Sequence, residues 1–341
     1  MANVSGARKL RWGVLGVAKI GTTKVIPAMQ RGRLSDVVAI ASRDSNRAAA
    51  AAAQLGIPKW FGSYEALLAD PDIDAVYIPL PNHLHVPWST RAAEAGKHVL
   101  CEKPIGLSSA EARSLIDVRD RTGVEIQEAF MVRSHPQWIA ARDLVRAGRV
   151  GQLRSMLGHF SYFNDNPANI RNIPEFGGGG LMDIGCYPVN TSRFIFGAEP
   201  RRVAGAVDID PAFGVDRMAS MVLEFDAGHF AGTCGTQMAP YQRIQIVGTT
   251  GRLEIEIPFN APPDRPCRML IDAAGSPAGD SEIIELEICD QYTLQADEFA
   301  RAALSGTRVS SPLEDSVQNM LSIEAVERSA RSGKWETPDG G

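Results

Sequence analysis

Residues 11–30 read RWGVLGVAKIGTTKVIPAMQ, which is an apolar run, then a short loop, then a helical pattern. The loop follows G-x-G-x-x-G, with alanine in place of the second glycine, where the phosphates come closest. Small residues let a backbone approach a pyrophosphate, which then lies at the amino end of the following helix. A loop between a strand and a helix therefore predicts a dinucleotide-binding βαβ unit. Its candidate phosphate contacts are Gly16, Ala18, Lys19, Ile20 and Gly21.

Strand-like and helix-like segments continue to alternate up to about residue 130. Asp44 or Ser45 caps an alanine-rich helical stretch, and Gly96 fits the end of another. Regular βα units of this kind predict an α/β domain with a doubly wound parallel sheet over residues 1–130. Its further strands are expected at 37–42, in the core of 74–81, at 97–104 and at 124–130.

The pattern changes after residue 130. Between residues 201 and 288, apolar and polar residues alternate, with turn signals at Asp226 to Gly228 and at Ala274–Gly275. Helical spacing returns over about 291–304 and 313–332. We therefore expect residues 131–341 to form an α+β domain with a large, mostly antiparallel open sheet.

The composition excludes several classes of protein. The net charge of the 341 residues is −5, and no Lys/Arg-rich run points to nucleic acid. No apolar stretch approaches the roughly 20 residues of a membrane helix. The amino-terminal stretch carries no export signal, so we expect a cytoplasmic protein. Free thiols and no metal site are expected, because the five cysteines (Cys101, Cys186, Cys234, Cys267 and Cys289) are scattered without a C-x-x-C pair.

The end of the second strand bears on the choice of nucleotide. Enzymes that prefer NAD place Asp or Glu there, where it binds the ribose hydroxyls. This chain has Ser42 followed by Arg43, and Arg47 adds a second positive charge. A hydroxyl and guanidinium groups would bind a 2′-phosphate, which a carboxylate would repel. The pattern favours NADP(H); the alternative is that both arginines are solvated charges near Asp44.

Two motifs carry residues suited to proton transfer. Lys103 ends an expected strand in CEKP, at the sheet edge where ligands bind, and a lysine can exchange a proton with an alcohol as its hydride leaves. In GGGGLMDIGCY (177–187), Asp183 and Tyr187 are four residues apart and share one face of a helix. Beside Lys103 they would handle the proton of a hydroxyl group, and the glycines would let the chain pass close to cofactor and substrate. Alternatively, Asp183 caps the helix and Tyr187 packs in the core.

Other residues are candidates because of their place in the pattern. The loop after the strand expected at 74–79 should lie near the nicotinamide half of the nucleotide, next to the end of the CEKP strand. The candidate cofactor contacts there are Pro81, Asn82, His85, Glu102 and Lys103. The candidate substrate contacts are Lys103, Arg133, Tyr162, Arg171, Asp183 and Tyr187.

Three segments together resemble the Gfo/Idh/MocA oxidoreductases along nearly the whole chain. They are GVLGVAKIG near the start, AGKHVLCEKP at 95–104 and GGGGLMDIGCYPVN at 177–190. The resemblance implies a Rossmann domain followed by a domain whose open sheet often forms an oligomer interface, in a homodimer or homotetramer. It also implies that Lys103 is the catalytic lysine, commonly before a cis-proline, and that Asp183 and Tyr187 fill the D-x-x-x-H/Y positions.

Tyrosine at position 187 and the Ser42–Arg43 pair resemble the glucose–fructose oxidoreductase branch, which includes aldose–aldose oxidoreductases. This implies an NADP(H)-dependent enzyme that moves a hydride to or from an aldose or a related cyclic polyol or carbonyl compound. If the cofactor is held tightly, the enzyme would shuttle hydride between two sugars. The alternatives are a dihydrodiol dehydrogenase, a 1,5-anhydrofructose-type reductase and, more distantly, a non-catalytic NADP-binding sensor.

Overall fold

The computed structural model describes residues 8–273 and 281–339, which form two compact units. The first unit joins Met1–Met131 with Asp290–Ser316, and the second joins Val132–Cys289 with Val317–Gly341. This division differs from a single boundary at residue 130, because α8 (Gln291–Ser305) packs with the first unit. The rings of Trp12 and Phe299 lie 5.2 Å apart in that packing. The turn expected at Ala274–Gly275 lies outside the described residues.

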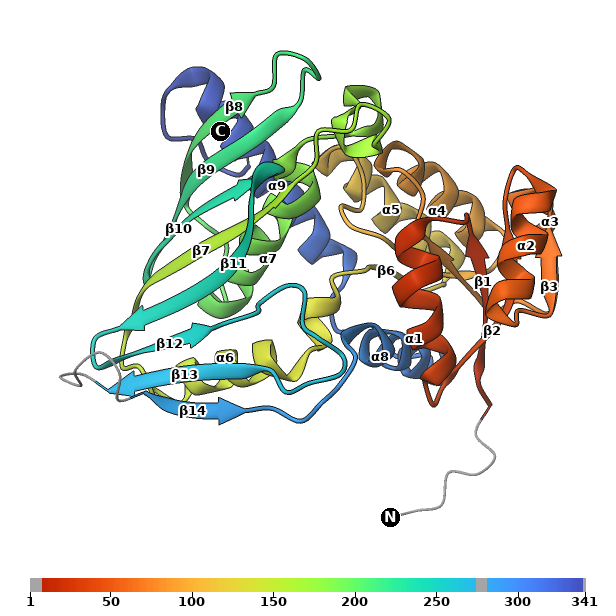
Figure 1. Cartoon of the computed structure of the whole chain (residues 1–341), viewed down its shortest axis with the longest axis horizontal. Helices are drawn as coiled ribbons and strands as arrows, with labels where there is room; N and C mark the ends of the chain where they lie inside the picture. Colours follow the sequence, from red (N-terminus) through yellow and green to blue (C-terminus); the bar gives the residue numbers. More distant parts are fainter. Residues whose placement is uncertain (1–7, 274–280, 340–341) are drawn as a thin grey trace. The chain divides into compact units, whose positions relative to one another are not determined.

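The first unit contains the predicted doubly wound sheet. All of its strands are parallel and follow the order β3-β2-β1-β4-β5-β6 (Figure 1). This order places the ends of β1 and β4 side by side at the sheet centre, where such folds bind ligands. The strands are β1 (Leu10–Leu15), β2 (Ser35–Ala41), β3 (Lys59–Phe61), β4 (Ala75–Ile78), β5 (His98–Cys101) and β6 (Ile126–Glu128).

Side-chain caps define the helices of the first unit. Asp44 accepts hydrogen bonds from the amides of Asn46 and Arg47, and Ser63 and Ser108 each accept one from an amide in the first turn of α3 and α5, respectively. Left-handed Gly56 and Gly123 end two of them. The helical segments are η1 (Gly21–Val25), α1 (Ile26–Arg31), α2 (Ser45–Leu55), α3 (Tyr64–Leu68), η2 (Asn82–Leu84), α4 (His85–Glu94), α5 (Ser109–Thr122) and α8.

The second unit contains a large sheet in the order β14-β13-β12-β11-β7-β10-β9-β8. Neighbouring strands are antiparallel except β7 and β10, which run parallel, so the predicted mostly antiparallel sheet is confirmed. The strands are β7 (Leu153–Phe163), β8 (Arg202–Ile209), β9 (Asp216–Phe225), β10 (Gly228–Gly235), β11 (Gln237–Gly248), β12 (Gly251–Ile255), β13 (Arg268–Ala273) and β14 (Glu282–Glu285).

Helices cover one face of this second sheet, with α7 and α9 on the same side (Figure 1). Asn319 of α9 joins them, because it accepts a hydrogen bond from Arg193 and donates one to the carbonyl of Cys186. The helical segments of this unit include η3 (Met131–Ser134), α6 (Pro136–Arg146), η4 (Ile170–Asn172), η5 (Pro174–Phe176), η6 (Leu181–Gly185), α7 (Cys186–Phe196) and α9 (Leu313–Ser332).

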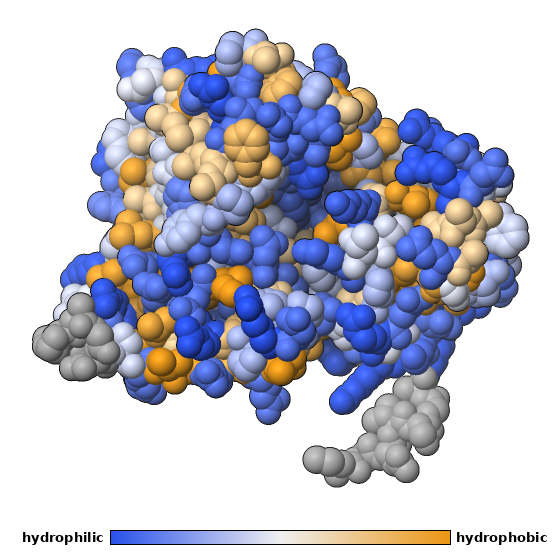
Figure 2. Space-filling view, viewed as in Figure 1, coloured by the Kyte–Doolittle hydropathy of each residue, from blue (hydrophilic) through white to orange (hydrophobic). Residues whose placement is uncertain are grey.

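The surface is mixed in polarity. Hydrophilic residues predominate on the face seen in Figure 2, with hydrophobic residues interspersed among them. Across residues 8–273 and 281–339, no helix combines the length and the apolar character needed to cross a membrane.

Candidate functional site

The glycine loop after β1 has the shape that a phosphate site requires. Gly16 adopts φ +117°, and a Cβ there would lie 2.9 Å from the Leu80 side chain. Gly21 lets the following helix approach the end of β4, because its Cβ would already lie 3.6 Å from Tyr77 and 3.4 Å from Pro79. Lys19 between them is exposed, and the helix begins at that residue. The amino end of this helix therefore faces solvent beside a close backbone turn, which fits a dinucleotide phosphate.

The end of β2 presents a hydroxyl and two cationic side chains. Ser42 is buried, and its Oγ accepts a hydrogen bond from the Asp44 amide at 3.2 Å. Arg43 and Arg47 are exposed, and Arg47 donates a hydrogen bond to the Val17 carbonyl in the glycine loop. Since the Asp44 carboxylate caps α2, it is already engaged with backbone amides. This arrangement fits an additional anionic group better than a bare ribose.

Tyr64 belongs to the same corner, although no sequence motif marks it. Its hydroxyl contacts the Arg43 side chain and lies 3.8 Å from where a Gly16 Cβ would stand. Burial raises the pKa of Tyr64, while the charges of Arg43 and Arg47 act in the opposite direction. The ring meets Trp88 edge to face at 4.8 Å, which fixes its orientation. Tyr64 thus links the phosphate turn to the arginine at the end of β2.

Lys103 follows β5, and the Lys103–Pro104 peptide is cis. Its neighbours are fastened to the sheet: the Glu102 amide donates to the Ile78 carbonyl, and Glu102 Oε1 accepts a 2.6 Å hydrogen bond from Tyr77. The Ile105 amide donates to the buried Glu128 carboxylate at 2.8 Å. Lys103 itself is half-buried between these anchors. A lysine held in this way can keep one position relative to a ligand.

His85 was expected to contact the cofactor, and the structure buries its side chain. The ring is fully buried, and Nδ1 and Nε2 lie 2.7 Å from the carbonyl oxygens of Pro104 and Leu80, respectively. Burial lowers the pKa of His85 to about 4, and the charge of Lys103 also lowers it. The neutral ring can donate to only one of these carbonyl oxygens at a time, and it lies buried between the Leu80 loop and the segment after Lys103. Pro81 and Asn82, which open η2, remain partly exposed.

In the second unit, Asp183 gathers two of the expected substrate residues. Its Oδ2 accepts a 2.5 Å hydrogen bond from the Tyr162 hydroxyl and lies 2.8 Å from Arg171 Nε. Asp183 is buried, whereas the Arg171 side chain is about two-fifths exposed. The Asp183 carboxylate raises the pKa of Arg171, and burial followed by the same carboxylate raises the pKa of Tyr162. The three side chains form one polar cluster, here called the Asp183 cluster.

Tyr187 lies beside this cluster, packed against aromatic rings. Its ring centroid is 5.8 Å from that of Phe160 and 5.6 Å from that of Phe259. The hydroxyl end is close enough to Arg171 to affect its pKa. Asp183 stands in a π-helical turn and Tyr187 in the α-helix that continues it, so the helix has a wider first turn than the i,i+4 spacing assumed.

Arg133 contacts the α7 helix. Its guanidinium lies 4.4 Å from the centre of the Phe194 ring and donates a hydrogen bond to Asn190. These contacts join η3 to α7. The remaining expected residues thus form two groups, which the structure describes within separate units: Lys103 with the nucleotide residues, and the Asp183 cluster with Tyr187.

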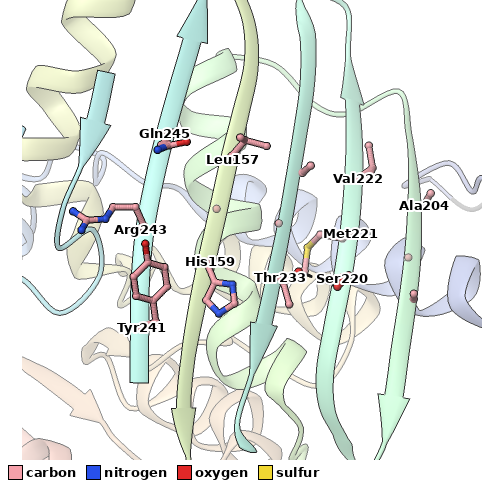
Figure 3. A pocket seen from close by; sticks show the side chains of 15 residues that line it. Leu157, His159, Ala204, Ser220, Met221, Val222, Thr233, Tyr241, Arg243 and Gln245 are labelled. Carbon is pink, nitrogen blue, oxygen red and sulfur yellow. Dashed lines mark hydrogen bonds between the residues drawn. The ribbon is translucent and has the colours of Figure 1, made fainter. Parts of the chain in front are cut away.

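A separate hollow of about 690 Å³ lies on the outer face of the second sheet (Figure 3). Its lining combines apolar side chains such as Leu157, Met221 and Val222 with small residues and a few polar ones, which include His159, Ser220, Thr233 and Arg243. No expected site residue is among its lining residues, so this hollow is not the site described above.

The homodimer or homotetramer that the resemblance implies stays a prediction. Within the described ranges, no group of three or more His, Cys, Asp or Glu side chains is placed to hold a metal ion.

Two parts of the chain match sequence models of known domains. Residues 10–130 match the model described as "Oxidoreductase family, NAD-binding Rossmann fold" of the Gfo/Idh/MocA proteins. Residues 138–254 match the model described as "GFO/IDH/MocA C-terminal domain". The two matches follow each other in the order of the two sheets.

Similar full-length proteins are also known. D-xylose 1-dehydrogenase (NADP(+)) 2 of Haloferax volcanii is 40% identical over 95% of this chain and 98% of its own length. The 3-ketoreductase KijD10 of Actinomadura kijaniata, solved with NADP and TDP-benzene, is 32% identical with a TM-score of 0.88, covering 94% of this chain and 98% of its own. Aldose-aldose oxidoreductase of Caulobacter crescentus, solved with glycerol, is 28% identical with a TM-score of 0.88, covering 97% and 100%.

Proposed function

Because the chain belongs to the Gfo/Idh/MocA oxidoreductase family, we propose that it transfers a hydride between NADP(H) and a neutral sugar, with an aldose as the reduced substrate. Membership confirms the resemblance read from the three motifs. The Asp183 cluster is the observation that carries the sugar assignment. Its charges balance, and it offers both hydrogen-bond donors and acceptors, which suits hydroxyl groups better than a carboxylate or a phosphate.

Ser42, Arg43 and Arg47 are the residues that would hold the 2′-phosphate of NADP(H). The Arg47 contact with the Val17 carbonyl and the Arg43 contact with Tyr64 keep both guanidinium groups near the glycine loop. The xylose dehydrogenase named above uses NADP(+), which agrees with this assignment. When bound, NADP(H) accepts or supplies the hydride.

Lys103 would exchange the proton of the reacting hydroxyl. During oxidation, the sugar C–H bond gives up its hydride, and the hydroxyl proton passes to Lys103 Nζ; reduction reverses both transfers. Asp183 and Arg171 would bind and orient the sugar hydroxyls, with Tyr162 holding the carboxylate in place. The Tyr187 hydroxyl would share the proton-handling role with Lys103, as the D-x-x-x-Y spacing implies.

Absorbance of reduced nicotinamide in the near ultraviolet tests the proposal directly. We expect an increase when the protein is mixed with NADP(+) and one of a panel of aldoses, D-xylose and D-glucose included. NAD(+) should give a slower increase at equal concentration. An increase that stops at one equivalent per protein would identify a sugar-to-sugar shuttle with bound cofactor. If NADP(+) binds but no sugar gives a signal, the sugar assignment is wrong.

Replacing Arg43 with alanine should weaken NADP(H) binding about tenfold or more, because a charge-assisted contact contributes about 1.5–3 kcal/mol. NAD(H) has no 2′-phosphate, so its affinity should change little. Titration calorimetry with both nucleotides measures the two affinities. Arg113→Ala, an exposed arginine on α5, is the matched control for lost surface charge. Equal losses for both nucleotides in Arg43→Ala would contradict the assignment.

A further inference from the structure

The helix that carries Asp183 and Tyr187 lacks a side-chain cap from its own segment. It begins at Leu181, directly after the four-glycine run, and Gly180 at its N-cap position has no side chain to accept a hydrogen bond. The first amides of a helix need acceptors from elsewhere. In this protein the acceptor comes from a strand of the sheet. Asp216, the first residue of β9, accepts a 2.6 Å hydrogen bond from the Leu181 amide through Oδ2. The Gly180 amide also donates to this carboxylate.

The Asp216 carboxylate also explains the glycine run. A Cβ on Gly179 would stand 2.0 Å from Asp216 Oδ1, and a Cβ on Gly180 would stand 3.2 Å from Oδ2. Gly179 adopts φ +114°, which disfavours other residues independently. Gly178 packs against the Arg171 backbone, and the Gly179 amide donates to the Arg171 carbonyl at 2.8 Å. These contacts inside the second unit explain why the positions are glycine. The sequence analysis had instead explained the glycines by a close approach of the chain to cofactor and substrate.

We propose that Asp216 is a positioning residue, which sets the location of Asp183 and Tyr187 by capping their helix across the sheet. It also ties that helix to the Arg171 segment through the shared glycine run. This inference rests on the proposed function, since it assigns Asp216 to the same reaction. Asp216 is not one of the expected substrate contacts, and it would act through the helix that it caps.

Asp216 is a buried carboxylate in surroundings that disfavour its charge. Burial raises the pKa of Asp216 to about 6, against the lowering effect of the Leu181 amide, and Glu327 of α9 raises it further. Tyr162 of β7 and Cys234 of β10 also lie within electrostatic range of it. A carboxyl group with a raised pKa in the folded state stabilises the fold only while protonated, and this contribution disappears as the pH rises through about 6. At neutral pH this proton-linked part of the stability is therefore mostly absent, and the hydrogen bonds to the Leu181 and Gly180 amides are what Asp216 contributes to the helix.

Two substitutions separate positioning from stability. Asp216→Ala removes the acceptor, and we expect kcat for the sugar to fall about tenfold or more, because small displacements of reacting groups are costly. Asp216→Asn keeps one acceptor oxygen without the charge, and it should restore kcat to within about threefold of wild type. Neither variant should weaken NADP(H) binding, and Asp216→Ala should lower the melting temperature by only about a few degrees, as expected for a lost helix cap. Asp226→Ala, at the other end of β9 and four-fifths exposed, is the matched control.

Hydrogen exchange gives a readout that does not depend on turnover. In Asp216→Ala, amides 180–187 should exchange faster than in wild type, while the amides of β1 and β2 should not change. Unchanged protection of 180–187, or wild-type kcat in this variant, would overturn the proposal. A fall in melting temperature with kcat preserved would assign Asp216 to stability and would also overturn it. If wild type is silent toward every sugar, the proposed function fails, and the exchange comparison still decides whether Asp216 holds the helix.

Discussion

Replacing Lys103 with methionine should lower kcat about a thousandfold and leave NADP(H) binding unchanged, since general acid–base catalysis contributes roughly 10²–10⁴ in rate. Methionine keeps the length and apolar stem of lysine but cannot exchange a proton. The anchors on both sides of position 103 are backbone or Glu102 and Glu128 contacts, so they survive the substitution. The nucleotide residues lie on other loops and should bind as before.

Three comparisons make this result specific. Single-turnover absorbance at saturating sugar measures the hydride step, and fluorescence titration measures NADP(H) binding. Lys103→Arg retains the charge but does not release its proton, so it should be nearly as impaired as methionine. Lys24→Met, in the exposed part of the first helix, controls for loss of a lysine. If Lys103→Met retains more than a tenth of the wild-type rate, Lys103 is not the proton-transfer group.

Much of the fold was predictable because local signals and global topology agree in this chain. Asp44, Ser63 and Ser108 cap helices at positions that the sequence marks with side chains of the right type. The short edge strand β3 escaped prediction because its three residues, including the exposed Trp60, show no alternation to recognise. The parallel pairing of β7 with β10 escaped as well, since it joins strands separated by more than sixty residues.

The candidate site was predictable only where a motif fixed both residue type and position. Asp183, Tyr162 and Arg171 do meet, although nothing in their spacing dictates one shared carboxylate oxygen. His85 was interpreted as a cofactor contact because sequence cannot distinguish a buried ring from an exposed one. Tyr64 carries no motif. Residues brought in from distant strands depend on packing that periodicity does not encode.

Substituting Asp183 with asparagine should lower kcat/KM by about a hundredfold or more, because the carboxylate both accepts the Tyr162 hydrogen bond and balances Arg171. Asparagine keeps the shape and one acceptor oxygen but removes the negative charge. The Arg171 guanidinium then loses its ion-pair partner at this position. Because Arg171 is about two-fifths exposed, solvent screens part of this effect, and we expect a stability loss of about 1–2 kcal/mol by urea denaturation.

The double variant Arg171→Met with Asp183→Asn separates the two effects of the carboxylate. If the stability loss comes from an unbalanced guanidinium, removing that guanidinium should restore most of the unfolding free energy. Activity should not recover, because the hydroxyl groups of the sugar still lack their ionised acceptor. Arg171→Met alone supplies the third corner of the cycle and should mainly raise KM. Recovery of activity together with stability would mean that Asp183 serves only to hold Arg171. Activity that stays low in a stable double variant would place the Asp183 carboxylate against the substrate itself.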